Sequence, residues 1–563
     1  MATTSSAVPV LVVGAGPTGL TLAAELARHG IQCRIIDKGT GPTHLSKAIG
    51  MQARTLEILD NLGIVDEILA AGHVVHGLSG HVNARRIFHF TYHELDSPYP
   101  LLLNIIQSDT ERILGGLVTR SGVLIEWETE LLGFTQDADG VNARVHRPDG
   151  SEEEIRAQWL VGSDGARSFV RHALELTFEG QTYDEYFALA DARIEWRLPD
   201  DEIHAFVNPE GVLFVLPLRE GRHRLIVADK SRDEDGDGAP DAPEPTFEDF
   251  QRAMATRGPG DATLSDPGWM TAFRVNARVA GQHRVGRVFV AGDAAHIHSP
   301  VGGQGLNTSV QDAHNLAWKL ALVVAGEADE SLLDTYDAER GPVAHSVIRM
   351  TNSLTNVLTL DNVAAQHARN LLMPLVGHVH AVTRQIAAQD SEIVVNYRHS
   401  PIVAEFRNGV FGEVRFAGGP RPGDRAPDVH PLVLQNGAGD RFFDVIRNAT
   451  WHTLLLFEGE QPSEATRQEL AGIAAEAERL YPGRLRAYVV SAEPGEGRIG
   501  DPDGALHERY DADDPCLYVI RPDGYIGLRG RPPELAALRS HLDRVLRRVD
   551  GASPGPTAEV LTG

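Results

Sequence analysis

The sequence has few cysteines, no long apolar run and a shortage of positive charge, and each of these deficits excludes a class of protein. Its 563 residues include only Cys33 and Cys516, too few for a disulfide framework or a thiolate metal site. No run of about 18 apolar residues is present to span a bilayer, and the start MATTSSAVPV lacks the basic region of a secretory signal. Lysine and arginine total 52 against 78 acidic residues, and a formal charge of −26 disfavours nucleic acid and anionic membranes as partners. We therefore expect a soluble, cytoplasmic protein with no nucleic-acid or membrane partner.

The first apolar strand, Val10 to Val13, is followed by the pattern of a dinucleotide-binding turn. GAGPTG opens a helix from Pro17 to His29, and a second strand then ends at Asp37. The dinucleotide spacing is held by Gly14, Gly16 and Gly19. Such glycines allow a tight turn, close approach to a pyrophosphate and close helix packing, and the acid suits a ribose hydroxyl. This order predicts nucleotide binding, since a nucleotide-free crossover would not need these glycines and this acid.

A second glycine loop lies between Arg287 and Lys319. The apolar run Val288 to Ala291 ends in Gly292-Asp293, and the loop PVGGQG then opens an amphipathic helix. A glycine loop at a helix start presents free backbone N–H groups and the positive end of the helix dipole. The pattern predicts a ligand pocket suited to a carbonyl, a phosphate or a developing oxyanion.

Two further stretches are candidates for the same site. The strand Gln158 to Val161 ends in Asp164-Gly165 before a helix start, a position suited to sugar or phosphate contacts. Lys47 and Arg54 could reach a diphosphate, or they could lie on a solvated helix face. The residues alone do not separate these two possibilities.

From Tyr183 to Val279 the pattern changes to the alternation of antiparallel strands, which predicts a separate sheet domain inserted into the nucleotide fold. Within it a calcium-loop pattern is matched by Asp233, Asp235, Asp237, Gly238 and Glu244. Three prolines, Pro240, Pro243 and Pro245, would block the helix that should follow such a loop. We therefore favour a solvated acidic loop and predict no metal site.

The C-terminal part begins after a proline- and glycine-rich linker, Ala417 to Asp428. Its predicted order of strands and helices, βαβ followed by ββα, is typical of a thioredoxin-like domain. No C-x-x-C is present, so a dithiol redox role has no residues to carry it. The tail after Gly551 is expected to be disordered.

Three of these elements together resemble the class A FAD-dependent monooxygenases, the aromatic-ring hydroxylases that include phenol hydroxylase and polyketide-tailoring hydroxylases. They are the Gly14 turn with Asp37, Asp164-Gly165, and Gly292-Asp293 with its PVGGQG loop. PGDRAPD at Pro422 to Asp428 and VIRPDGYIGLR at Val519 to Arg529 look like the C-terminal region of many members. The resemblance implies an α/β fold: a Rossmann-like FAD-binding domain, an inserted antiparallel-sheet substrate domain and a C-terminal thioredoxin-like domain. The implied parts are 1–182 (FAD-binding, first part, with substrate-domain strands near 82–100), 183–284 (substrate-binding sheet), 285–416 (FAD-binding, second part, and helical region), 417–550 (thioredoxin-like) and 551–563 (tail).

The resemblance also implies an FAD site assembled from these segments, with NADPH or NADH as a transient reductant. Asp37 would hold the ADP half, Gln107 the ribityl–phosphate region and Asp293 the ribityl chain, while Asp164 would serve both FAD and NAD(P)H. The implied cofactor-binding residues are Gly14, Gly16, Pro17, Thr18, Gly19, Asp37, Lys38, Lys47, Gln107, Asp164, Gly292, Asp293, Pro300, Gly303, Gly305, Leu306 and Asn307. Backbone donors of the loop suit the negative charge of reduced flavin. The predicted catalytic positions are therefore Pro300, Gly303, Gly305 and Asn307.

The implied reaction is reduction of FAD by NAD(P)H and reaction with O₂ to a flavin C4a-hydroperoxide, which hydroxylates a small aromatic substrate, phenolic or polyketide. The enzyme would be a monomer or homodimer. Baeyer–Villiger insertion or epoxidation on a polyketide would use the same fold, and a flavin-holding resistance protein that sequesters a drug is a further alternative. A flavin halogenase is disfavoured because no W-x-W-x-I-P motif is present.

Several histidines lie near the predicted site. His296 and His298 suggest a metal pair or a proton shuttle, but beside the flavin loop they are better interpreted as wall residues. His89, His93 and Arg85 are expected to border the substrate cavity and are candidates for the base that deprotonates a phenol.

Overall fold

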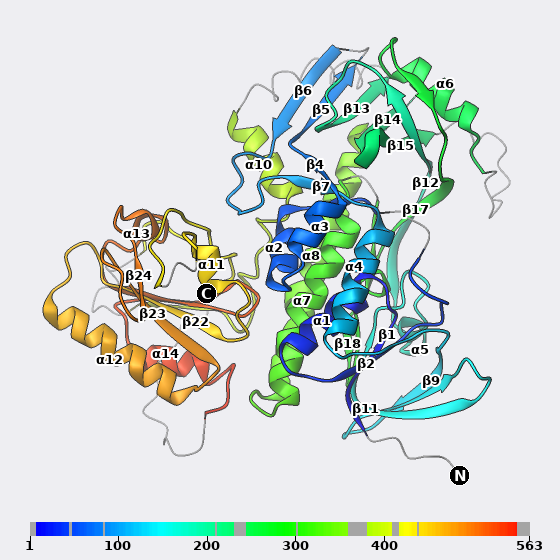
Figure 1. The fold of residues 1–563 in the computed structure, drawn as a ribbon. Helices are drawn as coiled ribbons and strands as arrows, with labels where there is room; N and C mark the ends of the chain where they lie inside the picture. The colour runs from blue at the N-terminus through cyan, green and yellow to red at the C-terminus, as the bar shows by residue number, and fades with distance from the viewer. Residues whose placement is uncertain are drawn as a thin grey trace.

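The computed structural model describes residues 7–43, 48–82, 85–208, 211–229, 244–299, 302–358, 380–407, 416–435 and 439–548. Within these ranges, the strands form sheets of eight, nine and six strands together with a small three-stranded sheet. The first two form one elongated body, and the six-stranded C-terminal sheet with its helices stands beside it (Figure 1). Most of the calcium-loop pattern, Asp233 to Gly238, and the tail 551–563 lie outside the described residues.

The eight-stranded sheet lies at the lower end of the larger body in Figure 1. Its order is β18-β19-β11-β1-β2-β8, and β9 and β10 extend β11 as an antiparallel ribbon. Because β1 pairs in parallel with β2 and β11, and β11 in parallel with β19, the carboxyl ends of these strands meet at one edge. The strands are β1 (Val8–Val13), β2 (Cys33–Ile36), β8 (Ile125–Glu126), β9 (Glu130–Gln136), β10 (Val141–His146), β11 (Glu152–Gly162), β18 (Arg284–Val285) and β19 (Val288–Val290).

One face of this sheet is covered by α1 (Pro17–Arg28), which packs against both α4 (Gln107–Arg120) and α7 (Gln304–Val324). Almost every residue of α7 from Leu306 to Leu322 is buried. A helix that is buried on all sides belongs to the core. The sequence pattern predicted an amphipathic helix here, and the difference arises because a second layer of the protein covers the outer face of α7.

The nine-stranded sheet lies at the other end of the larger body (Figure 1). Its order is β20-β17-β12-β15-β14-β13-β5-β6, with β16 beside β12, and β5 and β13 form its one parallel pair among the described strands. The expected alternation of antiparallel strands is thus observed. The first strands of this sheet, however, begin earlier than the predicted range near 82–100, because β5 starts at Gly77, and no strand covers residues 92–100. The strands are β5 (Gly77–Val82), β6 (Arg85–Thr91), β12 (Phe178–Glu195), β13 (Glu202–Asn208), β14 (Gly211–Pro217), β15 (Arg222–Asp229), β16 (Thr263–Ser265), β17 (Met270–Ala280) and β20 (His296–Ile297).

Shorter elements lie around and between the two large sheets. The three-stranded sheet has the order β3-β7-β4. Helix α6 packs on the nine-stranded sheet and begins with a capping box in which Thr246 and Asp249 exchange hydrogen bonds. These elements are β3 (Gly50–Met51), β4 (His73–Val75), β7 (Leu102–Asn104), α2 (Ala53–Asn61), α3 (Val65–Ala71), α5 (Phe169–Ala173), α6 (Phe247–Arg257), α8 (Asp334–Leu358) and α10 (His380–Asp390).

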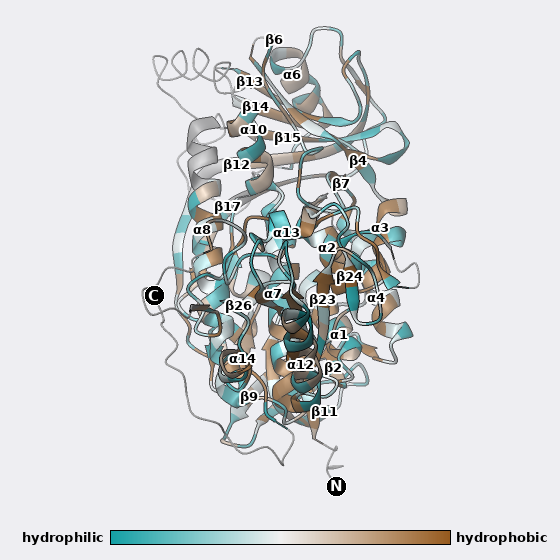
Figure 2. Cartoon of the chain, turned by 90° about the vertical axis from the view of Figure 1, so that its left-hand side faces the viewer, coloured by the Kyte–Doolittle hydropathy of each residue, from teal (hydrophilic) through white to brown (hydrophobic). Residues whose placement is uncertain are grey.

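The C-terminal sheet has the order β21-β26-β25-β22-β23-β24. Helix α12 turns buried Leu470, Ile473, Ala477 and Leu480 toward it, and the helix is mixed in hydropathy in Figure 2. A thioredoxin-like identity for this unit stays a prediction. Its elements are β21 (Ala404–Arg407), α11 (Phe442–Ile446), β22 (His452–Phe457), α12 (Glu464–Leu480), β23 (Leu485–Ser491), β24 (Arg498–Gly500), α13 (Ala505–Arg509), β25 (Cys516–Ile520), β26 (Ile526–Arg531) and α14 (Leu535–Leu542).

A buried ionic network joins the C-terminal unit to the larger body. Glu339 of α8 accepts hydrogen bonds from Lys319 of α7 at 2.8 Å and from both terminal nitrogens of Arg521 at 2.6 and 2.9 Å. Asn315 and Ser400 donate to the same carboxylate at 2.7 and 2.6 Å. Because charges removed from water need partners, this carboxylate fixes two helices to the turn after β25.

Among the residues that the structure describes, no helix combines the length and the apolarity that crossing a membrane requires.

Candidate active site

The turn after β1 packs against the end of β11. Gly14 has a φ of +107°, and a Cβ there would lie 2.3 Å from the carbonyl oxygen of Ser163. A Cβ on Gly19 would lie 1.9 Å from the carbonyl oxygen of Gly14. In contrast, a Cβ on Gly16 would meet no protein atom within 4 Å. Gly14 and Gly19 are therefore needed for packing, whereas Gly16 faces open space in front of α1.

Asp37, at the end of β2, faces this turn as predicted from the sequence. Its two carboxylate oxygens accept hydrogen bonds from the backbone N–H groups of Ala15 and Gly39, each at 2.7 Å. The carboxylate is thus fixed at the edge of the glycine turn. Lys38 follows it and is exposed.

Asp164, after β11, caps a helix. Its carboxylate accepts from the Ser168 hydroxyl at 2.5 Å and from the N–H of Val170 at 3.1 Å, at the start of α5. Arg171 of the same helix donates to the carbonyl oxygen of Ala294 at 3.0 Å. The Asp164 turn is thereby linked to the segment that follows β19.

The end of β19 contacts the start of α1. Gly292 has a φ of +62°, and a Cβ there would lie 2.3 Å from the hydroxyl oxygen of Thr18. The next residue, Asp293, is exposed at the edge of the sheet. Because Gly292 and Thr18 touch, the structure brings together the predicted residues after β1 and β19.

The segment Gly302–Asn307, which we call the glycine loop, enters α7 through the left-handed residue Gly303, and no side chain caps the helix. Asn307 holds the glycine loop in place, because its amide group donates to the carbonyl oxygens of Gly50 at 2.9 Å and Gly303 at 2.7 Å. Its oxygen accepts from the N–H of Gln52 at 2.9 Å. The first turn of α7 is therefore tied to β3 and to the residue after it, and no side chain caps its N–H groups.

A half-buried acid, Asp390, supports the other side of this loop. Gln304 donates to the backbone carbonyl of Asp390 at 2.9 Å, and the hydroxyl of Tyr92 donates to the Asp390 carboxylate at 2.7 Å. Burial raises the pKa of Asp390 to about 6. The contact joins the glycine loop to α10 and to the segment after β6.

A second acid, Glu392, lies behind α7. Its carboxyl group contacts the hydroxyl of Thr308 at 2.9 Å and the amide of Gln311. Burial raises the pKa of Glu392 from 4.5 to about 8, so the group is mostly protonated at pH 7.

Replacing Glu392 with glutamine is expected to stabilise the protein at high pH. A raised folded-state pKa means that the stability contributed by Glu392 is full below pH 4.5 and is lost as the pH rises to about 8. Glutamine does not titrate, so the variant should match the wild type at pH 5 and exceed it by more than about 1 kcal/mol at pH 9. Urea unfolding at both pH values measures this difference. An equal difference at pH 5 and pH 9 would contradict it.

A buried ion pair that the sequence analysis missed lies under the strand ends. Asp312 accepts from the N–H of Gly292 at 2.9 Å, from His296 at 2.7 Å and from Arg340 at 2.6 Å. Although burial alone would raise it, the pKa of Asp312 is held well below its usual range by His296 and Arg340. The helical spacing of Asp312 marks it as part of α7, but no local motif indicates that it holds the end of β19.

The remaining predicted residues differ in position. Gln107 is the first residue of α4 and donates to Glu111 at 2.9 Å, while Lys47 and Pro300 lie outside the described residues. Arg54 is buried, and it donates to Glu57 at 2.7 Å and to the carbonyl oxygen of Asp523 at 2.6 Å. The interpretation of Arg54 as a residue on a solvated face was therefore wrong, because this side chain joins α2 to the C-terminal unit.

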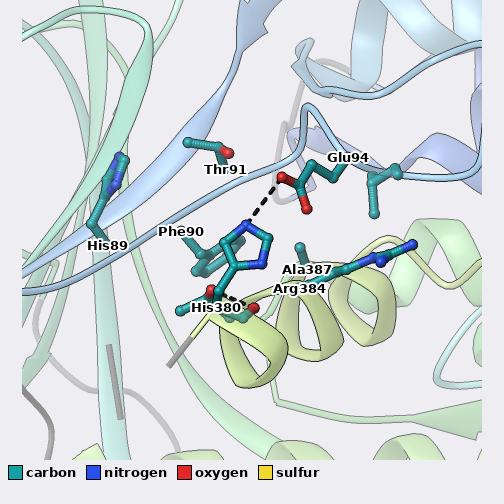
Figure 3. A pocket seen from close by; sticks show the side chains of 9 residues that line it. His89, Phe90, Thr91, Glu94, His380, Arg384 and Ala387 are labelled. Atoms are coloured by element: carbon teal, nitrogen blue, oxygen red, sulfur yellow. Dashed lines mark hydrogen bonds and ion pairs between the residues drawn. The ribbon is translucent and has the colours of Figure 1, made fainter. Parts of the chain in front are cut away.

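A cavity of about 280 Å³ lies between β6 and α10. Figure 3 shows Glu94 and His380 facing each other across it, with their side chains 3.0 Å apart. Of the predicted border residues His89 lines this cavity, whereas His93 stacks on His76 and Arg85 is exposed at the start of β6. The lining residues are His89, Phe90, Thr91, Glu94, Leu95, His380, Thr383, Arg384 and Ala387.

The parallel strand ends, the glycine turn of α1 and the uncapped start of α7 define a dinucleotide-binding α/β protein. Open space at Gly16 and in front of Gly303 leaves room for the backbone to approach a cofactor. The chain belongs to the FAD-binding domain family, whose model matches residues 7–351.

Named relatives narrow this class further. The chain is 34% identical to 6-methylpretetramide 4-monooxygenase of Streptomyces rimosus, over 97% of this chain and 95% of that protein. It is also 34% identical to pentachlorophenol 4-monooxygenase of Sphingobium chlorophenolicum, over 92% and 93% of the two chains. The structure matches anhydrotetracycline hydroxylase of Streptomyces rimosus with a TM-score of 0.74 and 30% identity, over 96% of this chain and 99% of that one. The protein is an FAD-dependent monooxygenase, in a family where NAD(P)H is the typical reductant.

Proposed function

We propose that this monooxygenase hydroxylates a polycyclic aromatic compound of the polyketide type, bound between β6 and α10. The observation that carries this proposal is the position of α10, which forms one wall of the cavity and contacts the glycine loop through its last residue, Asp390. The relatives support the substrate class, since 6-methylpretetramide and anhydrotetracycline appear in the names of proteins that resemble almost the whole chain. NADPH or NADH and O₂ are co-substrates in this proposal, which suits the cytoplasm, where both reductants are available.

The strand ends would hold FAD. Gly16 allows close approach of the pyrophosphate, and Asp37 is placed for the ribose of the ADP half. Asp293 is exposed at the position where the ribityl chain would pass. Reduced FAD supplies the activation of O₂ that delivers one oxygen atom to the ring.

The glycine loop would hold the flavin ring. The uncapped N–H groups at the start of α7 suit the negative charge of reduced flavin, and Asn307 holds them in place without solvent rearrangement. This arrangement also keeps the proposed flavin edge close to Asp390 and hence to α10.

The cavity has one apolar and one polar side. Phe90 and Leu95 offer an aromatic and an aliphatic surface, while Glu94, His380 and Arg384 can bind hydroxyl or carbonyl groups. Aromatic faces and a few placed polar groups are the usual means of orienting a flat ligand. His89 also contacts Glu202 at 3.2 Å, which would stabilise the ring of His89 if it took a proton from a phenol.

A single-ring phenol is the second candidate substrate, favoured by the similarity to pentachlorophenol 4-monooxygenase. A volume of about 280 Å³ is near the lower end of ligand cavities, so a compact phenol would also fit. The two candidates differ in how much of the cavity they fill.

The proposal predicts that polycyclic aromatics stimulate NAD(P)H oxidation by the FAD-loaded protein more than phenols do. A panel of anhydrotetracycline, aklavinone, phenol and pentachlorophenol would be compared, with ¹⁸O₂ and mass spectrometry of the products. One ¹⁸O atom in a hydroxylated polycyclic product supports the proposal. Tight binding of the ligand with no oxygen consumption would instead indicate sequestration, and a ring-expanded product would indicate Baeyer–Villiger insertion.

Matched variants on α10 locate the substrate. Thr383 lines the cavity, whereas Gln385 is exposed on the same helix and does not line it. Thr383→Trp should raise KM for the polycyclic substrate about tenfold or more with unchanged FAD content, and Gln385→Trp should not. Equal KM values for the two variants would place the substrate elsewhere.

A further inference from the structure

The segment Tyr92–Ser97, which we call the wall segment, follows β6 and forms part of the proposed substrate cavity. All of its residues are described, and none of them lies in a helix or strand. Glu94 and Leu95 line the cavity, and Figure 3 shows Glu94 facing His380. Because no helix or sheet fixes the wall segment, its position depends on the contacts made at its two ends.

At its first end the wall segment is tied to the larger body. The N–H of Tyr92 donates to the carbonyl oxygen of His76 at 2.9 Å, and its hydroxyl donates to Asp390 at 2.7 Å. The N–H of Leu95 then donates to the carbonyl oxygen of Tyr92 at 3.0 Å, and the N–H of Ser97 donates to that of Leu95 at 2.9 Å. These two short turns link the residues of the wall segment, so a shift of its last residues also displaces Leu95.

At its second end the wall segment is bound to the C-terminal unit through Asp96. Arg509, the last residue of α13, donates to Asp96 Oδ2 at 2.5 Å. The backbone N–H of Asp428 donates to Asp96 Oδ1 at 2.9 Å, and Arg425 donates to the carbonyl oxygen of Asp96. Both oxygens of this carboxylate, and its backbone carbonyl, are therefore held by residues of the C-terminal unit.

Asp96 is charged and needs these partners. Its side chain is 23% exposed, and burial alone would raise its pKa, but Arg425 and Arg509 hold the pKa below its usual range. A half-buried carboxylate is costly without cations, so the two arginines fix Asp96 to the C-terminal unit. Glu57 of α2 accepts from Ser97 at 2.8 Å and pairs with Arg425 at 3.2 Å, which extends the same ionic contact to the larger body.

We propose that the C-terminal unit determines how tightly a substrate binds, with Asp96 as the positioning residue through which it holds Glu94 and Leu95 in the cavity wall. Leu95 shares a hydrophobic cluster with Phe90 and with Ala387 of α10, so its position sets the width between the wall segment and α10. The proposal rests on the substrate cavity proposed above, but it does not depend on which polycyclic compound is bound there.

The first measurement needs no ligand. The side chain of Arg509 is 52% exposed, so Arg509→Gln should fold with an unchanged thermal midpoint. Hydrogen exchange followed by mass spectrometry should show the amides of the wall segment exchanging about threefold faster or more in this variant, because the segment opens more readily without its partner. Arg509→Lys keeps the charge and should exchange like the wild type. Unchanged exchange in Arg509→Gln would overturn the proposal.

Arg467 of α12 is the matched control for Arg509. It also lies on a helix of the C-terminal unit, and its side chain is 44% exposed. Its carboxylate partners, Glu458 and Glu464 at 3.4 and 3.9 Å, both belong to the C-terminal unit. Arg467→Gln should therefore leave the exchange of the wall segment as it is in the wild type, and equal acceleration in both variants would overturn the proposal.

The second measurement is the affinity for anhydrotetracycline, by calorimetry on the FAD-loaded protein without NAD(P)H, so that nothing turns over. Asp96→Ala should raise the Kd about tenfold, with unchanged FAD content. Arg509→Gln should raise it about threefold, because a partly exposed ion pair contributes less. The double variant should match Asp96→Ala, since both changes remove one contact. Additive effects, or wild-type affinity in Asp96→Ala, would overturn the role of Asp96.

Thr383→Trp separates this proposal from the proposed function. If it weakens anhydrotetracycline binding whereas Asp96→Ala and Arg509→Gln do not, the cavity is the substrate site and the role of the C-terminal unit is wrong. If Thr383→Trp binds as tightly as the wild type, or if the wild type does not bind, the proposed substrate position fails. The exchange rates of the wall segment then still decide whether Arg509 holds it.

Discussion

Replacing Gly16 with valine is expected to leave the folded protein intact and to weaken FAD binding about 100-fold, or about 2.7 kcal/mol. A Cβ at this position meets no protein atom within 4 Å, and its φ of −76° suits any residue. The space that the side chain would occupy is therefore the space needed by the pyrophosphate. Flavin absorbance after purification, a titration of the apo protein with FAD and thermal unfolding of the apo protein measure the two effects separately.

Two other glycines provide the controls. Gly133 in β9 also has no atom within 4 Å of a Cβ but lies away from the strand ends, so Gly133→Val should retain FAD. A Cβ on Gly19 would lie 1.9 Å from a backbone oxygen, so Gly19→Val should lower the thermal midpoint of the apo protein itself. A Gly16→Val protein that purifies with full flavin would show that the cofactor does not approach this turn.

Replacing Glu339 with alanine is expected to cost about 3–5 kcal/mol of stability, the usual loss when one partner of a buried ion pair is removed. Arg521 would keep its charge in the interior with Asp523 as its remaining carboxylate partner. Burial already lowers the pKa of Lys319 to about 8, and the loss of Glu339 would remove the main group that opposes this shift. Lys319 and Glu339 are both fully buried, so water cannot replace the lost carboxylate. The denaturant midpoint of unfolding, followed at constant pH, measures the loss.

Glu330 is the matched control for Glu339. It pairs with Arg284 and Arg287 at 3.5 and 3.4 Å, but its side chain is 47% exposed. Glu330→Ala should therefore change stability by no more than about 0.5 kcal/mol. Similar losses for the two variants would mean that Glu339 contributes no more than a surface pair.

Much of the first sheet could be predicted because each signal is local. The strand, glycine turn, helix and acid from Val10 to Asp37 lie within one βαβ unit, and the strand ends at Asp164 and Gly292 are marked by short motifs. The α/β fold and the FAD-dependent class followed from these motifs taken together. The positions assigned to individual site residues and the boundaries of the domains remain predictions.

The rest depends on contacts between residues far apart in the chain. Asn307 holds Gly50 and Gln52, and Glu392 lies against Thr308, yet none of these pairs has a sequence spacing that a pattern could show. Arg54 was misread for the same reason, since its partner Asp523 lies in another unit of the fold. The sequence pattern did not predict strand β5, because its residues, GLSGHV, include two glycines and show only a partial apolar alternation.

The double burial of α7 has a consequence for how the chain assembles during synthesis. Trp318 and Leu322, near its C-terminal end, share a hydrophobic cluster with Leu456, Leu517 and Leu538. A ribosome that has released the first 330 residues has made every strand of the FAD-binding sheet, but one side of this helix still faces water. Because such long-range contacts form late, the outer side of α7 can be buried only after most of the C-terminal unit has emerged. The C-terminal unit therefore covers the outer side of a helix whose inner side belongs to the core of the FAD-binding part.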